Sequence, residues 1–430
     1  MKIALIYSFK ESDWFSVTKI LKNLLAAYEH AYGKENLVHI NVPWDANDDD
    51  MGDAAKQLLA AEVDKIVFLD HKPNPVYFLK EVGREKLLEF EEVVFHIYGD
   101  FTLEFHRWNL LDSILMDANV KFICASKKQS QLVANLLNEN IKTFICPFPV
   151  ADKEFYFDQS KNDYIREKYN LKKTDTVFLY VGRLSTQKRN LETIETFLSM
   201  RASGKLDASH KFLIAGGFDL LGQHYLREGL LLGEYFRRVM HLMERYPKEV
   251  TESVQLLGSI ENSDLIPFYN TADYFLSMST YHDEDYGMAI AEALCCGLPC
   301  ILTDWAGYSS FNLGLDQATR YVPVKLGRKS PEFDCEKLIT FLSDAKKSKV
   351  ADSERKDIAQ KYHENYTVSA CAEILKTIHS ADKVVYKGFS DMLHRLGYIM
   401  FFKRAPFLNE FDNCFNKFYY KVYGCYAGEN

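Results

Sequence analysis

The chain alternates short apolar runs, many of them rich in β-branched residues, with longer stretches in which apolar residues recur at helical spacing. In the first part, the apolar runs are residues 2–7, 38–42, 65–69, 93–98, 121–124 and 143–146. The helical spacing is clearest in residues 15–28, where one helix face collects Val17, Ile20, Leu21, Leu24 and Leu25. This alternation predicts an α/β fold in which parallel strands are covered by helices on both faces.

A second series of the same kind follows a polar connection at residues 147–163, which begins with two closely spaced prolines. Its apolar runs are residues 176–181, 211–215, 253–256, 274–277, 300–303 and 320–322. With 430 residues, the chain is too long for one ordinary core. We therefore expect two doubly wound parallel-sheet domains, residues 1–160 and residues 161–380.

Residues 381–430 differ in character because aromatic side chains are frequent in them. Our first interpretation is that this segment forms helices that return to the first domain. A second interpretation is that it lies on a membrane surface by its apolar face. In that case its cations would meet anionic lipid, namely Lys403, Arg404, Lys417 and Lys421.

Composition and charge exclude several classes of protein. The formal net charge of -8 disfavours a general nucleic-acid binder, because phosphate backbones require a basic face. The nine cysteines form no CxxC pair, which favours reduced, mostly buried thiols in a cytoplasmic protein. The apolar start MKIALIYSF is too short for a signal peptide, and no run of about 18 apolar residues predicts a membrane span. The sequence leaves the oligomeric state open.

Candidate chemistry is sought just after the strands, because open parallel sheets bind ligands at the carboxyl ends of their strands. The run Gly182-Arg183-Leu184-Ser185-Thr186-Gln187-Lys188 directly follows the strand predicted at residues 176–181. Gly182 permits a tight turn, and Arg183 and Lys188 can both face one anion, as the two phosphates of a diphosphate require. The alternative is an ion-pair cluster at the protein surface.

A second candidate is the stretch from residue 283 to residue 307, DEDYGMAIAEALCCGLPCILTDWAG. Tyr286, Gly287, Met288 and Ala289 begin a predicted helix, whose first N–H groups and dipole form an anion site. Gly287 would let a phosphate approach the backbone closely.

Two carboxylates accompany this predicted helix. Glu292 lies among apolar residues, where an unpaired ionised carboxylate is costly, so we expect it to accept hydrogen bonds from a ribose diol. Glu284 precedes the helix and is placed to meet the group that hangs from the far phosphate. The alternatives are a helix-capping carboxylate for Glu284 and a salt-bridged core residue for Glu292.

Seven residues separate Glu284 from Glu292, with GRLSTQK upstream and GLPCILTDWAG downstream. This pattern resembles retaining GT-B glycosyltransferases of the family 4 type, which carry an EX7E motif. The resemblance is strong over residues 170–380 and weaker over residues 1–160. It implies two Rossmann-like domains facing across a cleft. It also implies transfer of a sugar from a UDP- or GDP-sugar to a glycan, lipid-linked or protein acceptor, with retention of configuration.

The resemblance also implies roles for individual residues. Arg183 and Lys188 would hold the diphosphate and stabilise it as a leaving group, together with the backbone amides of residues 287–289. Glu292 would hold the ribose and Glu284 would contact the donor sugar. The base would rest near Gly216, Gly217, Gly258 and Ile260.

The first domain departs from the family pattern. Members commonly have a glycine pair after the first strand, whereas this chain has Tyr7-Ser8-Phe9-Lys10-Glu11-Ser12-Asp13. Members also place a histidine near the reacting sugar. Here the segment FHIYGD offers His96 slightly early and Asp100 as a further candidate, with Tyr98 at the expected place.

A metal-dependent transferase would hold Mg²⁺ or Mn²⁺ with a DxD carboxylate pair. Asp283-Glu284-Asp285 has that form, but it directly precedes the anion-binding helix, and Arg183 and Lys188 already supply positive charge. We therefore expect neither a metal nor another cofactor. The acidic run at residues 44–53 is interpreted as a solvated loop.

Two other functions fit the same architecture. One is a nucleotide-sugar epimerase or a glycan phosphorylase, which product analysis separates from a transferase. The other is a catalytically silent partner subunit that keeps the fold for assembly. Such a subunit would not need Arg183, Lys188, Glu284 and Glu292 together.

Overall fold

The computed structural model describes residues 1–9, 15–139, 141–158, 160, 162–219, 231–402, 404–409, 411–412 and 414–428; residues 15, 16, 100, 162 and 163 are described by their backbone only. The chain divides into two compact units. Unit 1 comprises residues 1–151 and 366–406, and unit 2 comprises residues 152–365 and 407–430.

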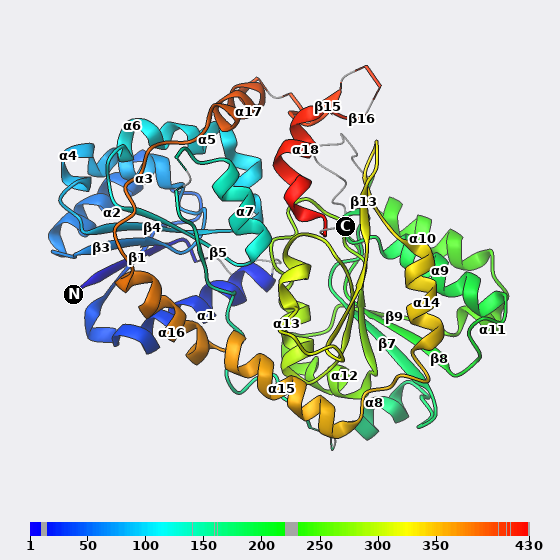
Figure 1. The fold of residues 1–430 in the computed structure, drawn as a ribbon. Coiled ribbons are helices and arrows are strands. Elements are labelled where there is room, and N and C mark those ends of the chain that lie inside the picture. The colour runs from blue at the N-terminus through cyan, green and yellow to red at the C-terminus, as the bar shows by residue number, and fades with distance from the viewer. Residues whose placement is uncertain are drawn as a thin grey trace. The chain divides into compact units, whose positions relative to one another are not determined.

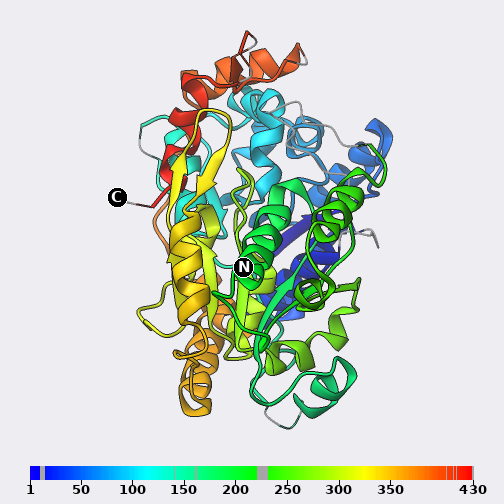
Figure 2. The same ribbon diagram turned by 90° about the vertical axis from the view of Figure 1, so that its right-hand side faces the viewer.

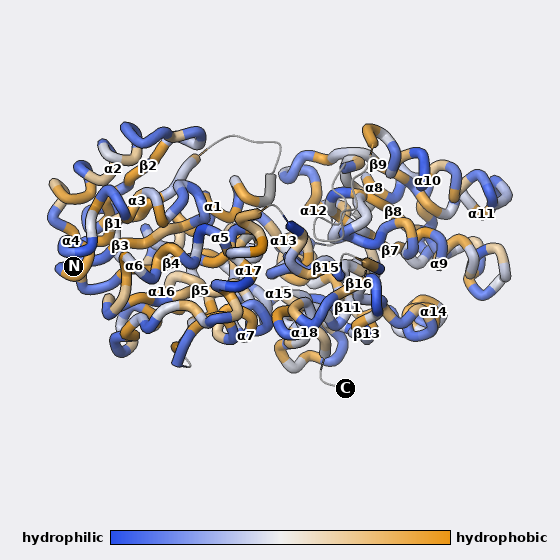
Figure 3. The backbone as a smooth tube through the Cα atoms, turned by 90° about the horizontal axis from the view of Figure 1, so that it is seen from above, coloured by the Kyte–Doolittle hydropathy of each residue, from blue (hydrophilic) through white to orange (hydrophobic). Residues whose placement is uncertain are grey.

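Unit 1 is built on a six-stranded parallel sheet with the strand order β2-β1-β3-β4-β5-β6 (Figure 1). The strands are β1 (Ile3–Tyr7), β2 (Leu37–Asn41), β3 (Lys65–Phe68), β4 (Glu92–Ile97), β5 (Val120–Cys124) and β6 (Phe144–Ile145). Figure 3 shows that apolar residues concentrate along the central strands β1, β3 and β4. A parallel sheet with this composition requires cover on both faces.

Helices supply that cover. The side-by-side pair α1 (Phe15–Tyr32) and α16 (Val368–Ser380) lies on one face of the unit 1 sheet (Figure 1). The helices α3 (Pro75–Val82), α5 (Phe105–Trp108) and α6 (Asp112–Leu115) lie on the other face. The remaining helices of this unit are α2 (Asp48–Ala60), α4 (Arg84–Leu87), α7 (Lys127–Asn135) and α17 (Asp391–Phe401). Short 3-10 turns occupy Lys34–Asn36, Gly99–Glu104 and Asn109–Leu111.

Unit 2 is also built on a six-stranded parallel sheet, with the strand order β12-β11-β10-β7-β8-β9. Its strands are β7 (Thr176–Val181), β8 (His210–Ala215), β9 (Val254–Gly258), β10 (Tyr274–Ser277), β11 (Cys300–Thr303) and β12 (Thr319–Val322). Two short antiparallel pairs are added, β13 (Val324–Leu326) with β14 (Pro331–Phe333) and β15 (Leu408–Asn409) with β16 (Cys414–Phe415).

The helices of unit 2 are α8 (Asn162–Lys168), α9 (Asn190–Ala202), α10 (Glu234–Glu244), α11 (Lys248–Thr251), α12 (Ile266–Thr271), α13 (Met288–Cys295), α14 (Cys335–Asp344), α15 (Asp352–Tyr366, which ends at the boundary with unit 1) and α18 (Lys417–Tyr423). Its 3-10 turns include Thr186–Lys188, Asn262–Asp264, Ala306–Phe311 and Gly424–Tyr426. Figure 2 shows α18 beside the β13–β14 hairpin. None of the described helices is long and apolar enough to cross a membrane.

The predicted α/β fold with two doubly wound parallel sheets is confirmed. Three details differ from the predictions. The units meet at residues 151 and 152 rather than 160 and 161, and residues 407–430 group with unit 2, whereas residues 381–406 belong to unit 1. The acidic run expected as a loop contains the start of α2, where Asn47 and Asp50 form a capping box. Carboxylates are favourable at that end of a helix because of its dipole.

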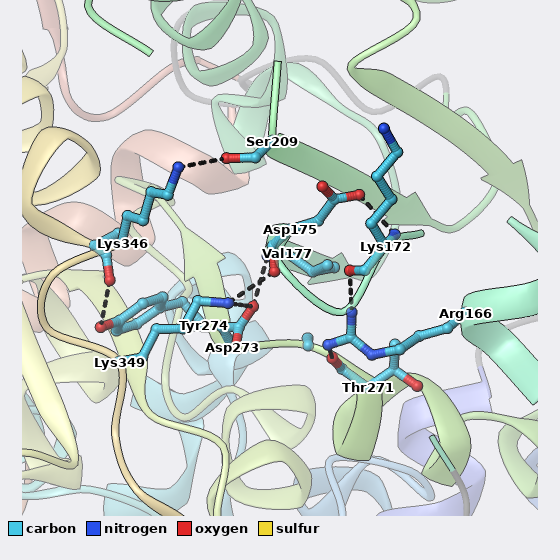
Figure 4. Close-up of polar contacts among 12 residues, drawn as sticks. Arg166, Lys172, Asp175, Val177, Ser209, Thr271, Asp273, Tyr274, Lys346 and Lys349 are labelled. Carbon is cyan, nitrogen blue, oxygen red and sulfur yellow. Dashed lines mark hydrogen bonds and ion pairs between the residues drawn. The ribbon is translucent and has the colours of Figure 1, made fainter. Parts of the chain in front are cut away.

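Polar side chains close the amino edge of the unit 2 sheet (Figure 4). Lys349 Nζ donates to the Asp175 carbonyl at 2.7 Å and to the Asp273 carboxylate at 3.0 Å. Arg166 donates to the carbonyls of Lys172 and Thr271 at 2.9 and 3.2 Å. These donors satisfy backbone and carboxylate oxygens where the strands begin, so this edge has a structural role.

A buried polar network ties α16 to the sheet of unit 1. Glu92, at the start of β4, contacts Lys121 at 2.6 Å and His379 at 2.6 Å. The His379 ring also lies 3.3 Å from the Tyr28 hydroxyl, which in turn lies 2.9 Å from His96 Nε2. Burial, reinforced by the nearby His379, lowers the pKa of His96 to about 3. His96 is therefore neutral in the folded protein near pH 7.

This network predicts a specific loss of stability in acid. An unfolded histidine takes up a proton below its ordinary pKa of about 6.5, whereas folded His96 excludes the proton down to about pH 3. The stability that neutral His96 contributes is thus complete above pH 6.5 and is lost as the pH falls. The loss should reach about 1.4 kcal/mol by pH 5.5. We expect the stability gap between wild type and His96→Asn, measured by urea unfolding, to shrink by this amount between pH 7.5 and 5.5. A constant gap would contradict the assignment.

Candidate functional site

The strand order of unit 2 creates one position where loops from different parts of the chain must meet. The sheet grows from β7 through β8 to β9 on one side, and then continues with β10 on the other side of β7. Loops that leave β7 and β10 at their carboxyl ends therefore diverge to opposite faces, which is the position where open parallel sheets bind ligands. The turn that carries Lys188 follows β7, and the loop that carries Glu284 follows β10.

Lys188 and Glu284 form an ion pair at this position. Lys188 Nζ lies 2.5 Å from Glu284 Oε2, and the two side chains are only 19% and 7% exposed. The same carboxylate oxygen accepts a hydrogen bond from Ser279 Oγ at 2.6 Å. The structure thus brings together two residues that the sequence assigned to one site, although they lie 96 residues apart.

The loop around Glu284 is fixed by its backbone. The Gly307 N–H donates to the Glu284 carbonyl at 2.9 Å, and the Glu284 N–H donates to the Tyr281 carbonyl at 3.3 Å. A Cβ atom at Gly307 would lie 2.1 Å from the Asp285 carbonyl oxygen. Residue 307 must therefore be glycine for the turn after β11 to approach the loop this closely.

Helix α13 begins next to this loop. Gly287 precedes its first residue with a φ of 111°, in the left-handed region that favours glycine. The N–H groups of Ile290 and Ala291 bond back to the Gly287 carbonyl, and no side chain caps the helix. The N–H groups of Met288 and Ala289 have no partner within an α-helix, so this helix start offers donors to an anion. Tyr286, in the preceding turn, is buried.

Glu292 lies one and a half turns into α13 and is 4% exposed. Its Oε2 accepts a hydrogen bond from the Tyr269 hydroxyl at 2.9 Å. Burial, with the charge of Glu292 nearby, raises the pKa of Tyr269 well above its usual value, so the phenol remains a donor. The carboxylate that the sequence singled out is therefore buried and held by a neutral hydroxyl.

Arg183 stands apart from the pair of Lys188 and Glu284. Its guanidinium is 44% exposed and lies 2.5 Å from the Asp219 carboxylate, beyond the end of β8. The Arg183 carbonyl accepts a hydrogen bond from the buried Tyr180 hydroxyl at 2.9 Å. The surface ion pair that the sequence left as an alternative is present, and the exposed side chain can reorient toward an anion.

Glycines gather where β7, β8 and β9 end. The Gly182 N–H donates to the Ala215 carbonyl, and the Gly216 N–H donates to the Gly258 carbonyl at 2.8 Å. A Cβ atom at Gly216 would lie 1.8 Å from the Gly182 oxygen. Gly217 is the next residue, and Ile260 lies two residues beyond Gly258. The predicted base-side residues therefore share one edge of the sheet, and their backbones are in close contact.

The two candidates of unit 1 have a different setting. His96 is 3% exposed and contacts Tyr28 inside the network described above. Its imidazole is held by Tyr28 in the core of unit 1. This favours the interpretation that His96 supports the end of a strand and does not contact a sugar. Asp100 begins a 3-10 turn after β4, and its side chain lies outside the described residues. Tyr98 is also buried, against Phe148.

Three residues that hold the candidate site residues in place were not predicted from the sequence. Arg189, in the left-handed conformation with a φ of 53°, donates to Thr280 Oγ1 at 2.9 Å and so ties the Lys188 turn to the Glu284 loop. Tyr269 holds Glu292, and Ser279 holds Glu284. The double cation Lys188-Arg189 was a visible signal in the sequence, whereas nothing near Tyr269 distinguishes it from a core aromatic residue. Among the described residues, no cluster of three or more His, Cys, Asp or Glu side chains is arranged to hold a metal ion.

A comparison with protein families finds one match, to the family described as glycosyl transferases group 1, over residues 161–313. Residues 161–313 are therefore similar to group 1 glycosyl transferases. They include the Lys188 turn, the Glu284 loop and α13. None of the curated proteins matches the sequence significantly.

Solved structures match over most of the chain. HepE from Anabaena, in complex with UDP and glucose, matches with a TM-score of 0.59 at 14% identity, over 89% of this chain and 100% of HepE. A glycosyltransferase from Rickettsia africae gives 0.61 at 17% identity, over 89% and 100%. A sucrose-phosphate synthase from Thermosynechococcus elongatus gives 0.57 at 17% identity, over 88% and 98%. These likenesses show that the chain has the GT-B fold.

The close approach at Gly307 predicts a sharp effect of adding one methyl group. Gly307→Ala should lower the free energy of unfolding of unit 2 by about 1–3 kcal/mol, because the new Cβ collides with the Asp285 backbone. Gly424→Ala is the matched control, since residue 424 has a φ of -58° and a Cβ there meets nothing within 4 Å. Denaturant unfolding of both variants measures the difference. Equal stability of the two variants would contradict the described turn.

Proposed function

We propose that this protein is a retaining, metal-independent glycosyltransferase that moves a sugar from a UDP- or GDP-sugar to an acceptor. The observation that carries the proposal is the buried pair of Lys188 and Glu284 at the point where the sheet of unit 2 changes direction, beside the uncapped start of α13. The match of residues 161–313 to group 1 glycosyl transferases supports the reaction class. The UDP-sugar ligand of HepE supports the donor class.

The proposed chemistry rests on charge. Breaking the bond between sugar and diphosphate leaves negative charge on the leaving group, and fixed positive groups lower the cost of that charge. Lys188, the N–H groups at the start of α13 and, after leaving Asp219, Arg183 would supply them. An arriving diphosphate competes with Glu284 for Lys188. The Glu284 carboxylate then becomes available to the hydroxyls of the donor sugar.

The nucleoside would bind beside these groups. Glu292, held on one oxygen by Tyr269, would accept hydrogen bonds from the ribose diol. The base would lie along Gly216, Gly217, Gly258 and Ile260, where side chains are small or the backbone itself forms the surface. The missing side chains at the glycines allow a planar ring to approach the strand ends.

The acceptor is proposed only by class, as a glycan, a lipid-linked oligosaccharide or a protein. We also propose a cytoplasmic location, with peripheral contact to the inner face of the membrane if the acceptor is lipid-linked. His96 and Asp100 are the candidates of the first domain for contact with the transferred sugar. The burial of His96 argues against such a contact. Analysis of the product distinguishes transfer from epimerisation or phosphorolysis.

Substitution of Lys188 or of Glu292 should impair transfer, each in a different way, without unfolding the protein. Lys188→Met removes the cation that faces the leaving group, and the reduction in kcat should be about 100-fold or more. Glu292→Gln keeps the size of the side chain and should mainly raise the KM for the donor. Steady-state rates with a panel of nucleotide sugars, and titration calorimetry with UDP and GDP, measure both effects.

Lys248→Met is the control for charge, because Lys248 is an 87% exposed lysine of unit 2 that lies in α11. Its rates should equal those of the wild type. Full activity of both Lys188→Met and Glu292→Gln would show that the site assignment is wrong.

Excess EDTA should leave transfer unchanged. The reason is that Lys188, Arg183 and the start of α13 supply the positive charge for which other transferases use Mg²⁺ or Mn²⁺. Rates measured with EDTA, and again after adding each metal ion, test this expectation. A strict requirement for a divalent ion would instead favour Asp283, Glu284 and Asp285 as metal ligands.

A further inference from the structure

The last part of unit 2 forms a compact group of aromatic rings, which we call the C-terminal aromatic cluster. Its members are all buried: Phe407, Phe415, Tyr419, Tyr423 and Tyr426. The rings of Phe415 and Tyr419 stack with centroids 3.6 Å apart, and Tyr423 contacts the rings of Tyr419 at 4.8 Å and Tyr426 at 5.6 Å. Such a cluster gains stability from apolar burial and from the geometry of its ring pairs.

Backbone contacts fasten this segment to the β13–β14 hairpin. The Phe415 N–H donates to the Arg328 carbonyl at 2.9 Å, and the Tyr420 hydroxyl donates to the Gly327 carbonyl at 2.8 Å. Arg328 also pairs with Asp412 at 2.7 Å. These contacts fix α18 beside the hairpin, as Figure 2 shows.

The cluster packs directly against the loop that carries Glu284. His282, two residues before Glu284, is 2% exposed, and its ring lies 5.3 Å from the ring of Tyr423 and 6.3 Å from that of Tyr419. One side of the loop is therefore covered by α18. Without these rings, His282 would face solvent or an empty space.

A second contact acts on the same loop through Trp305. The Trp305 indole N–H donates to the Tyr281 carbonyl at 2.7 Å, and its ring meets Tyr426 edge to face at 5.7 Å. Ala427 forms a β-bridge with Trp305. The Tyr281 carbonyl also accepts the Glu284 N–H, so the position of Trp305 bears on the backbone of Glu284 itself.

We propose that the C-terminal aromatic cluster holds the 281–285 loop in the conformation that presents Glu284 to Lys188, with Tyr423 and Tyr426 as positioning residues. The loop has no regular secondary structure, so its conformation depends on what packs against it. The cluster covers it through His282, and Trp305 fixes its backbone. The consequence for catalysis rests on the proposed function, whereas the consequence for the loop does not.

Hydrogen exchange and kinetics together test the proposal. Tyr423→Ala removes the ring that faces His282, so amide exchange in the peptide spanning residues 279–287 should speed up at least tenfold. The kcat for transfer should fall at least tenfold, while the KM for the donor changes less than threefold. Tyr423→Phe keeps the ring and should restore both properties.

Phe411→Ala is the matched control, because Phe411 lies in the same segment and is fully exposed. Its exchange and its rates should equal those of the wild type. Tyr426→Ala removes a ring that contacts both Trp305 and Tyr423, and it repeats the test if Tyr423→Ala proves unstable. Exchange of the peptides that contain β8 and β9, in unit 2, reports whether each variant is folded.

Two results would overturn the proposal. One is unchanged exchange at residues 279–287 in folded Tyr423→Ala and Tyr426→Ala. The other is faster exchange with an unaltered kcat. If the wild type transfers no sugar from any nucleotide donor, the proposed function fails, and the exchange data still decide whether the cluster holds the loop.

Discussion

The topology of the unit 2 sheet is the constraint on which the candidate site depends. Because the chain adds β8 and β9 on one side of β7 and β10 on the other, the loops after β7 and β10 are adjacent at one edge. No local preference of residues near 188 or near 284 could bring these side chains together. The glycine turns, the start of α13 and the ion pair all lie at the carboxyl ends of these strands, where open parallel sheets bind ligands.

The two units treat buried carboxylates in different ways. Glu92 is enclosed by Lys65, Lys121 and His379, so its charge is fully compensated by groups that have fixed positions in the core. Glu284 has one lysine and one serine hydroxyl as partners, at the edge where a ligand would enter. A charge that is compensated from all sides stabilises an arrangement. A charge balanced by a single movable cation can exchange that cation with a ligand.

Much of this architecture could be predicted from the sequence. The apolar runs at 176–181, 274–277 and 300–303 coincide with β7, β10 and β11, because fully buried parallel strands must be apolar throughout. The candidates of unit 2 could also be named from the sequence, since Glu292 in an apolar helix and the Gly182–Lys188 turn are local signals, and their part in catalysis stays a prediction. The network of Tyr28 and His379 was not predictable, because these residues are 351 positions apart. The division of residues 381–430 between the two units could not be predicted either, because aromatic residues are frequent throughout this segment.

The backbone contact between Gly182 and Gly216 has a consequence for altering the protein. Residue 216 accepts no side chain, because the first atom of one would overlap the Gly182 oxygen. Gly217 is different: a Cβ atom there would meet only Ser259 Oγ, at 3.0 Å. Variants at this edge of the sheet should therefore keep glycine at position 216 and change positions 217 and 259 as a pair.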